Sequence, residues 1–80
     1  MANANYKTGL KRYIKIALER QEVNQKFDNG ELTTVEELDA VEKAARRFWV
    51  AVEGLWHLDI NTIREAEIEA GIKEKNRAYC

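Results

Sequence analysis

Residues 33–58 read TTVEELDAVEKAARRFWVAVEGLWHL and carry the most regular pattern in the chain. Apolar residues recur there at spacings of three and four, which at about 100° per residue places them on one side of a helix. The recurring residues are Leu38, Val41, Ala45, Phe48, Val52 and Leu55. Adjacent apolar pairs such as Phe48 and Trp49 exclude the alternation of a strand. The stretch therefore predicts one amphipathic helix over about residues 35–57.

The connection before this helix carries stop and start signals. Asn29 and Gly30 both tolerate left-handed backbone angles, so an earlier helix can end there and the chain can reverse. Thr34 and Glu37 are spaced as a capping box, in which each side chain bonds to the backbone amide of the other residue. A short connection makes antiparallel neighbours of the helices on either side. We therefore expect a turn at about residues 28–33 that closes a helical hairpin.

Two further helices are predicted, over about residues 5–27 and 60–77. The first begins with an apolar stripe from Tyr6 to Ala17. Polar residues then occupy the continuation of that stripe, and the later apolar residues lie on another side of the helix. These polar residues are Gln21, Asn24 and Gln25. The predicted fold is all-α, an antiparallel hairpin of two long helices plus a shorter third C-terminal helix, in a single domain over residues 1–80.

The chain is short and nearly neutral. With 80 residues the core is at the small end of self-sufficiency, and the single cysteine, Cys80, excludes a disulfide within the chain. The formal net charge of −1 argues against binding nucleic acid through bulk charge. No stretch resembles a signal peptide or is apolar enough to span a bilayer. We expect a soluble, cytoplasmic protein whose shortage of core favours association with another chain.

No residue pattern predicts catalysis. Glu53 and His57 are four apart in the predicted helix and could share a metal ion, but the single histidine leaves such a site incomplete within one chain. A surface pair is the simpler interpretation, and a metal site would need both residues together across a dimer. Cys80 has no base placed to activate it. We therefore predict that the protein is not an enzyme and has no catalytic residues, no cofactor and no resident metal.

Spare apolar surface is the feature that points to a function. The first and third predicted helices each carry a second apolar stripe, and a terminal helix packed on a hairpin buries only one. The residues of these second stripes are Ile16, Val23, Phe27, Ile68, Ile72 and Tyr79. Exposed apolar patches usually mark interaction sites, so we expect these six residues to form an interface, with a homodimer as the favoured arrangement. The alternative is that Ile68 and Ile72 are isolated exposed aliphatic residues.

Two tryptophans lie one heptad apart along the margin of the apolar stripe in residues 35–57. For Trp49 and Trp56 we expect packing in the core. The alternative is a role as interface anchors, because tryptophan is enriched where protein interfaces are energetically strongest.

A second function class is suggested by the basic start of the chain. Lys7, Lys11, Arg12 and Lys15 lie in the first predicted helix, which could track phosphates. The pairs Lys15–Glu19 and Glu22–Lys26 are spaced for ion pairs that would neutralise part of this charge.

Taken together, the sequence favours a small non-enzymatic protein–protein interaction module. Small chains without a catalytic or cofactor signature are often accessory or inhibitor proteins of a phage or plasmid that bind a larger partner, and we expect such a role here. A small nucleic-acid-associated protein is the alternative.

Overall fold

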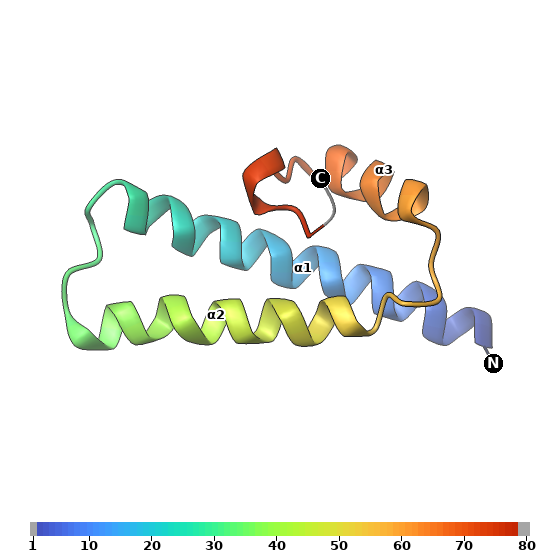
Figure 1. Cartoon of the computed structure of the whole chain (residues 1–80), viewed down its shortest axis with the longest axis horizontal. Helices are drawn as coiled ribbons and strands as arrows, with labels where there is room; N and C mark the ends of the chain where they lie inside the picture. The colour runs from blue at the N-terminus through green and yellow to red at the C-terminus, as the bar shows by residue number, and fades with distance from the viewer. Residues whose placement is uncertain (1, 79–80) are drawn as a thin grey trace.

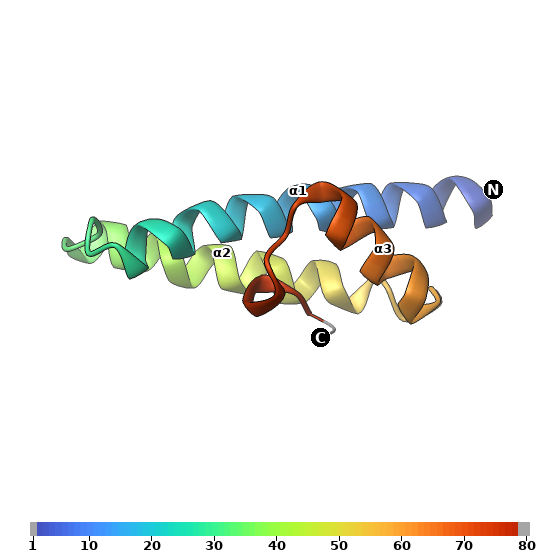
Figure 2. The ribbon, with the colours of Figure 1, turned by 90° about the horizontal axis from the view of Figure 1, so that it is seen from above.

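The computed structural model describes the backbone of residues 2–78 and the side chains of residues 9–78. Three α-helices follow one another, α1 (Ala2–Asp28), α2 (Val35–Glu53) and α3 (Ile60–Ala70), and a short 3₁₀ helix, η1 (Glu74–Asn76), comes last. α1 and α2 lie antiparallel along the 43 Å length of the molecule, and the shorter α3 and η1 pack on α1 (Figures 1 and 2). The predicted all-α hairpin with a shorter C-terminal helix is confirmed, with α1 starting slightly earlier than expected. Within the described residues, no helix is both long and apolar enough to cross a membrane.

The start of α2 is fixed by the capping box that the sequence predicts. The hydroxyl of Thr34 accepts a hydrogen bond from the amide of Glu37 at 3.1 Å, and the amide of Thr34 donates to the Glu37 carboxylate at 3.1 Å. The Thr34 hydroxyl also donates to that carboxylate, and this bond is the main reason why the pKa of Glu37 lies below its ordinary value. The amides of Thr34 and Thr33 lower the pKa further. Glu36 and Glu37 lie in the first turn, where the positive end of the helix dipole favours them.

α2 is shorter than predicted, because it ends at Glu53 and not near residue 57. The amide of Gly54 bonds back to the carbonyl of Ala51 at 3.1 Å, and the chain leaves the helix there. The turns that follow place Leu55 and Leu58 in the core, where both are buried. The apolar spacing that suggested a longer helix therefore reflects burial in the turns after α2.

α3 is also shorter than predicted, because it ends at Ala70 and not near residue 77. Gly71 follows with φ = +83°, a left-handed conformation that favours glycine. The amide of Gly71 bonds to the carbonyl of Ile68 at 3.1 Å and that of Ile72 bonds to the carbonyl of Glu67 at 3.0 Å, which is the Schellman arrangement of a helix end. The reversal turns Ile72 back into the protein.

The core is small and lies toward the end of the hairpin away from the turn. Its buried apolar residues are Tyr13, Ile16, Ala17, Phe48, Ala51, Leu55, Leu58, Ile63 and Ile72. The rings of Tyr13 and Phe48 are 5.5 Å apart at the junction of α1 and α2. On the side toward the turn, the guanidinium of Arg20 lies 4.2 Å from the centre of the Phe48 ring, in a cation–π contact that closes the core.

A buried polar contact ties α3 to α1. The hydroxyl of Tyr13 donates to Oε2 of Glu67 at 2.5 Å, and both side chains are fully buried. The amide of Ala78 donates to the same carboxylate oxygen at 3.3 Å. A buried carboxylate is costly unless it is hydrogen-bonded, so these contacts fix α3 and the end of the described chain against α1. Apolar periodicity gave no sign of this role for Glu67.

Polar residues of α1 hold the segment that follows α3. Oε1 of Gln21 accepts from the amide of Lys73 at 2.7 Å and from the side chain of Asn76 at 3.2 Å. The side-chain amide of Asn24 donates to Oδ1 of Asn76 at 3.2 Å. The polar continuation of the α1 stripe therefore bonds to the C-terminal segment of the same chain.

The contact between Tyr13 and Glu67 can be tested by a double-mutant cycle. Tyr13→Phe should lower the free energy of unfolding by about 1–3 kcal/mol, because it removes a donor from a buried carboxylate. Tyr13→Phe/Glu67→Leu should cost less than the sum of the single changes, since neither side chain then leaves the other unpaired. Urea denaturation of the four proteins measures this coupling. Additive losses would show that the two side chains contribute independently.

The capping box predicts a stability loss that depends on pH. Thr34→Ala should destabilise the protein by about 0.5–2 kcal/mol at neutral pH, the usual cost of losing an N-cap side chain. The folded-state pKa of Glu37 is lowered, so its contribution is complete above the ordinary carboxyl pKa and disappears as the pH falls through the lowered value. The difference between wild type and Thr34→Ala should therefore shrink in strongly acidic buffer. Thermal melts at both pH values measure it, and a difference that grew on acidification would contradict the assignment.

Candidate interaction surface

Within the described part of the chain, α2 has one helical neighbour. Among the helical elements, it packs against α1 alone, while α3 and η1 lie on α1 (Figure 1). No side chain between residues 18 and 47 is buried, so the half of the hairpin next to the turn lies outside the core. Two helices without a third layer leave part of their apolar surface in water. The side of α2 that faces neither α1 nor the core is therefore the first candidate for a contact with another molecule.

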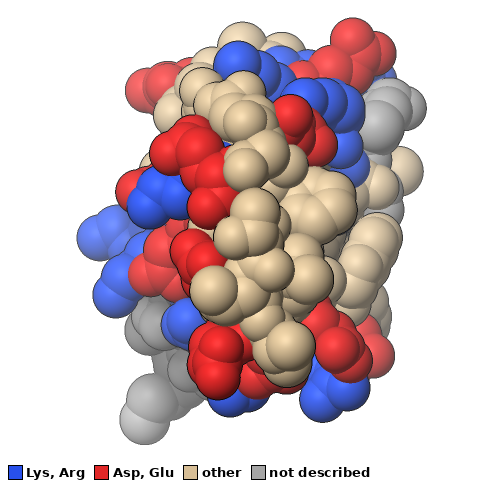
Figure 3. Space-filling model, turned by 90° about the vertical axis from the view of Figure 1, so that its left-hand side faces the viewer, with Lys and Arg blue, Asp and Glu red and all other residues tan. Residues whose placement is uncertain are grey.

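Four apolar residues share one side of α2 next to its contact with α1. We call this set the α2 face, and it consists of Val35, Leu38, Ala45 and Trp49. Leu38 is 43% exposed, Trp49 53% and Val35 80%, while the small Ala45 is half-buried. Seen from the turn end, uncharged residues form a band across the molecule, with acidic and basic side chains on both sides of it (Figure 3). The sequence places these residues in α2, but its periodicity alone did not indicate that they lack a neighbour.

The prediction that both tryptophans pack in the core is wrong. Trp49 rests edge-on against Phe48, with ring centres 5.1 Å apart, and its outer part faces solvent at the margin of α2. Trp56 is 84% exposed, and its ring centre lies 5.5 Å from that of the neighbouring His57 ring. The reason is that α2 ends before Trp56, and Leu55 fills the buried position in that turn.

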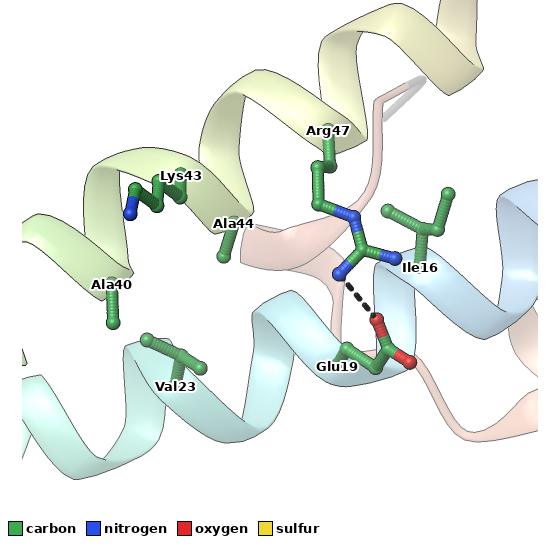
Figure 4. Close-up of a pocket in the computed structure, with 7 residues that line it drawn as sticks. All are labelled: Ile16, Glu19, Val23, Ala40, Lys43, Ala44 and Arg47. Carbon is green, nitrogen blue, oxygen red and sulfur yellow. Dashed lines mark ion pairs between the residues drawn. The ribbon is translucent and has the colours of Figure 1, made fainter.

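A groove of about 290 Å³ lies on the other side of the hairpin, between α1 and α2 (Figure 4). Its lining residues are Ile16, Glu19, Val23, Ala40, Lys43, Ala44 and Arg47. The small side chains of Ala40 and Ala44 leave the space, and Arg47 reaches across its edge to pair with Glu19 at 3.3 Å. The volume is just below the usual range for small-molecule sites, and the floor is aliphatic. The groove suits one inserted apolar side chain better than a substrate.

The six residues predicted to form an interface do not lie on one surface. Ile16 and Ile72 are buried in the core of the chain itself, so their assignment to an exposed stripe is wrong. Ile16 packs inside because it lies where α1 meets α2, and Ile72 does so because the chain reverses at Gly71. Phe27 and Ile68 are exposed, and Val23 lines the groove. Tyr79 lies outside the described residues. The interface role of the exposed members stays a prediction.

The basic residues of α1 are less neutralised than expected. Lys11, Arg12 and Lys15 are exposed, and no carboxylate of the described side chains forms an ion pair with them. The predicted Lys15–Glu19 pair is absent because Glu19 pairs with Arg47 of α2. The predicted pair between Glu22 and Lys26 is present at 3.8 Å. Lys7 belongs to α1, but its side chain lies outside the described part.

The structure gives no support to the metal site considered for Glu53 and His57. α2 ends at Glu53, so the two residues do not share a helical side. Among the described side chains, no three His, Cys, Asp or Glu residues lie together so that they could hold a metal ion. Cys80 lies outside the described residues.

A comparison of the chain with protein-family models, with curated proteins and with solved structures found no match.

Proposed function

We propose that this chain is a non-enzymatic protein–protein interaction module that binds through the α2 face. The single observation that carries the proposal is that α2, an amphipathic helix of 19 residues, packs against one other helix among the described elements. Its uncovered margin presents Leu38 and the half-exposed ring of Trp49. Tryptophan in such a setting is typical of strong contact points in protein interfaces.

The chemistry of the surface also favours protein binding over catalysis. The α2 face is aliphatic and aromatic, and the groove on the opposite side of the hairpin has an aliphatic floor with an ion pair at its edge. Both features suit the apolar side chains of a protein. An accessory or inhibitor protein that occupies a surface of a larger partner would need no more than this, and that role is part of the proposal.

The proposal predicts that partner binding depends on the α2 face. Tagged wild-type protein expressed in its native host should retain a specific protein partner, which can be another copy of the chain. Leu38→Asp/Trp49→Ala should reduce the recovered partner by about tenfold or more, since hot-spot residues contribute about 2 kcal/mol or more each. Quantitative mass spectrometry of the retained proteins measures the loss.

The matched control for this experiment is Ile68→Asp on α3. Ile68 is 59% exposed, so a charge there tests the effect of an apolar-to-acidic change at another surface. Retention of the partner by Ile68→Asp together with its loss in Leu38→Asp/Trp49→Ala supports the proposal. Equal recovery with all three proteins would contradict it, and loss only with Ile68→Asp would move the interface to α3.

Nucleic-acid association is the second candidate, because Lys11, Arg12 and Lys15 are exposed without an ion pair among the described side chains. In that case the wild type should be retained on double-stranded DNA or RNA at low salt and released as salt rises. Lys11→Glu/Lys15→Glu should abolish retention, with each lost phosphate contact lowering the salt slope by about one. Electrophoretic mobility shifts across a salt series measure this. A wild type that is not retained at low salt would eliminate this candidate.

A further inference from the structure

The charges of α2 are divided between its two halves. Residues 35–42 contain four acidic residues and no basic one, whereas residues 43–52 contain three basic residues and no acidic one. The acidic residues are Glu36, Glu37, Asp39 and Glu42, and the basic residues are Lys43, Arg46 and Arg47. A second α2 laid alongside in the same direction would place like charges together. In the opposite direction, Asp39 and Glu42, which border the α2 face, would lie near Arg46 of the other copy, whereas Lys43 and Arg47 line the groove on the other side of the hairpin.

The apolar residues of the α2 face are also arranged symmetrically about the middle of the helix. Leu38 and Trp49 lie at similar distances on either side of residues 43–44, and both are about half-exposed. If two copies of α2 cross antiparallel at that point, Leu38 of each copy lies level with Trp49 of the other. Ala45 lies next to the crossing point, where a small side chain permits close approach of two helices. A two-fold contact of this kind uses the same surface on both copies and is closed.

From these observations we propose that the partner of the α2 face is a second copy of this chain, bound through an antiparallel contact between the two α2 helices. The inference rests on the proposed function and names its partner. Each copy contributes its hairpin of α1 and α2, so the contact forms a four-helix arrangement in which α2 gains the neighbour it lacks within one chain.

The ion pairs within α2 do not oppose this contact. Asp39 pairs with Lys43 at 3.2 Å and Glu42 pairs with Arg46, all with largely exposed side chains. Exposed ion pairs of this kind contribute little to stability, so their charges can be shared with a second helix at small cost. Complementary charges across the contact then fix the antiparallel direction.

Complementary charge reversal tests the proposal. The variant Asp39→Lys/Glu42→Lys replaces the two acidic residues that border the α2 face with basic ones, and Arg46→Glu replaces the basic residue beside them with an acidic one. Each variant alone should have its dimer dissociation constant raised more than about tenfold, because like charges then face each other. An equimolar mixture should form a one-to-one heterodimer, since one helix is mainly basic and the other acidic. Sedimentation velocity over a concentration series measures all three samples and the wild type.

Two controls make the result independent of folding defects. Glu65→Lys/Glu69→Lys reverses two exposed charges on α3 and should dimerise as the wild type does. In Trp56→Phe, Trp49 is the only tryptophan, and its fluorescence should shift to the blue as the concentration rises through the dissociation constant. Circular dichroism checks that each variant remains helical.

The outcomes separate this inference from the proposed function. A wild type that stays monomeric at all concentrations, with no shift in Trp49 fluorescence, would overturn the inference, as would a mixture of reversed variants that stays monomeric. If such a monomer still recovers another protein through the α2 face, the proposed function stands and only the identity of the partner is wrong. A monomer that recovers no protein would overturn both.

Discussion

The difference in helix length is the constraint on which the rest of the structure depends. α1 has 27 residues and α3 has 11, so at about 1.5 Å per residue α3 can cover less than half of α1. The left-handed conformation at Gly71 ends α3 and turns the chain back before it can cover more. The core therefore gathers where three helices meet, and α2 keeps a single neighbour. An uncovered α2 face is a direct consequence of this arrangement.

The C-terminal segment extends over α1 by polar contacts instead of apolar packing. Gln21 and Asn24 hold Lys73 and Asn76 through hydrogen bonds, and the carboxylate of Glu67 holds Ala78 and the hydroxyl of Tyr13. These bonds position the segment but bury little apolar surface. The polar continuation of the first stripe of α1 is thereby bonded within the chain, whereas Phe27 of its second stripe stays exposed.

Local signals predicted the fold well, whereas long-range contacts had to be observed. The hairpin, its turn and the capping box at Thr34 follow from spacing and backbone preference over a few residues. The errors came from extending one helical period too far, because Ile72 continues the spacing of α3 while the chain has already reversed at Gly71. The pairing of Tyr13 with Glu67 joins residues 54 positions apart, which no helical period indicates. For the α2 face, the sequence placed Leu38 and Ala45 in the apolar stripe of the helix and Trp49 at its margin, and only the packing of α3 on α1 shows that no second helix covers these residues in the described structure.

The helix dipole explains only part of the charge division in α2. Acidic residues are favourable near the start of a helix and basic ones near its end, but this effect fades within the first and last turns. Glu36 and Glu37 lie in the first turn and are accounted for in this way. Glu42 and Lys43 lie in the middle of the helix, where the dipole favours neither sign, and the final residue is acidic Glu53, opposite to its preference. The ion pairs Asp39–Lys43 and Glu42–Arg46 within α2 account for the change of sign at residues 42–43, because an acidic residue four positions before a basic one stabilises a helix. The proposed antiparallel contact would use charges that the helix already places next to its apolar side.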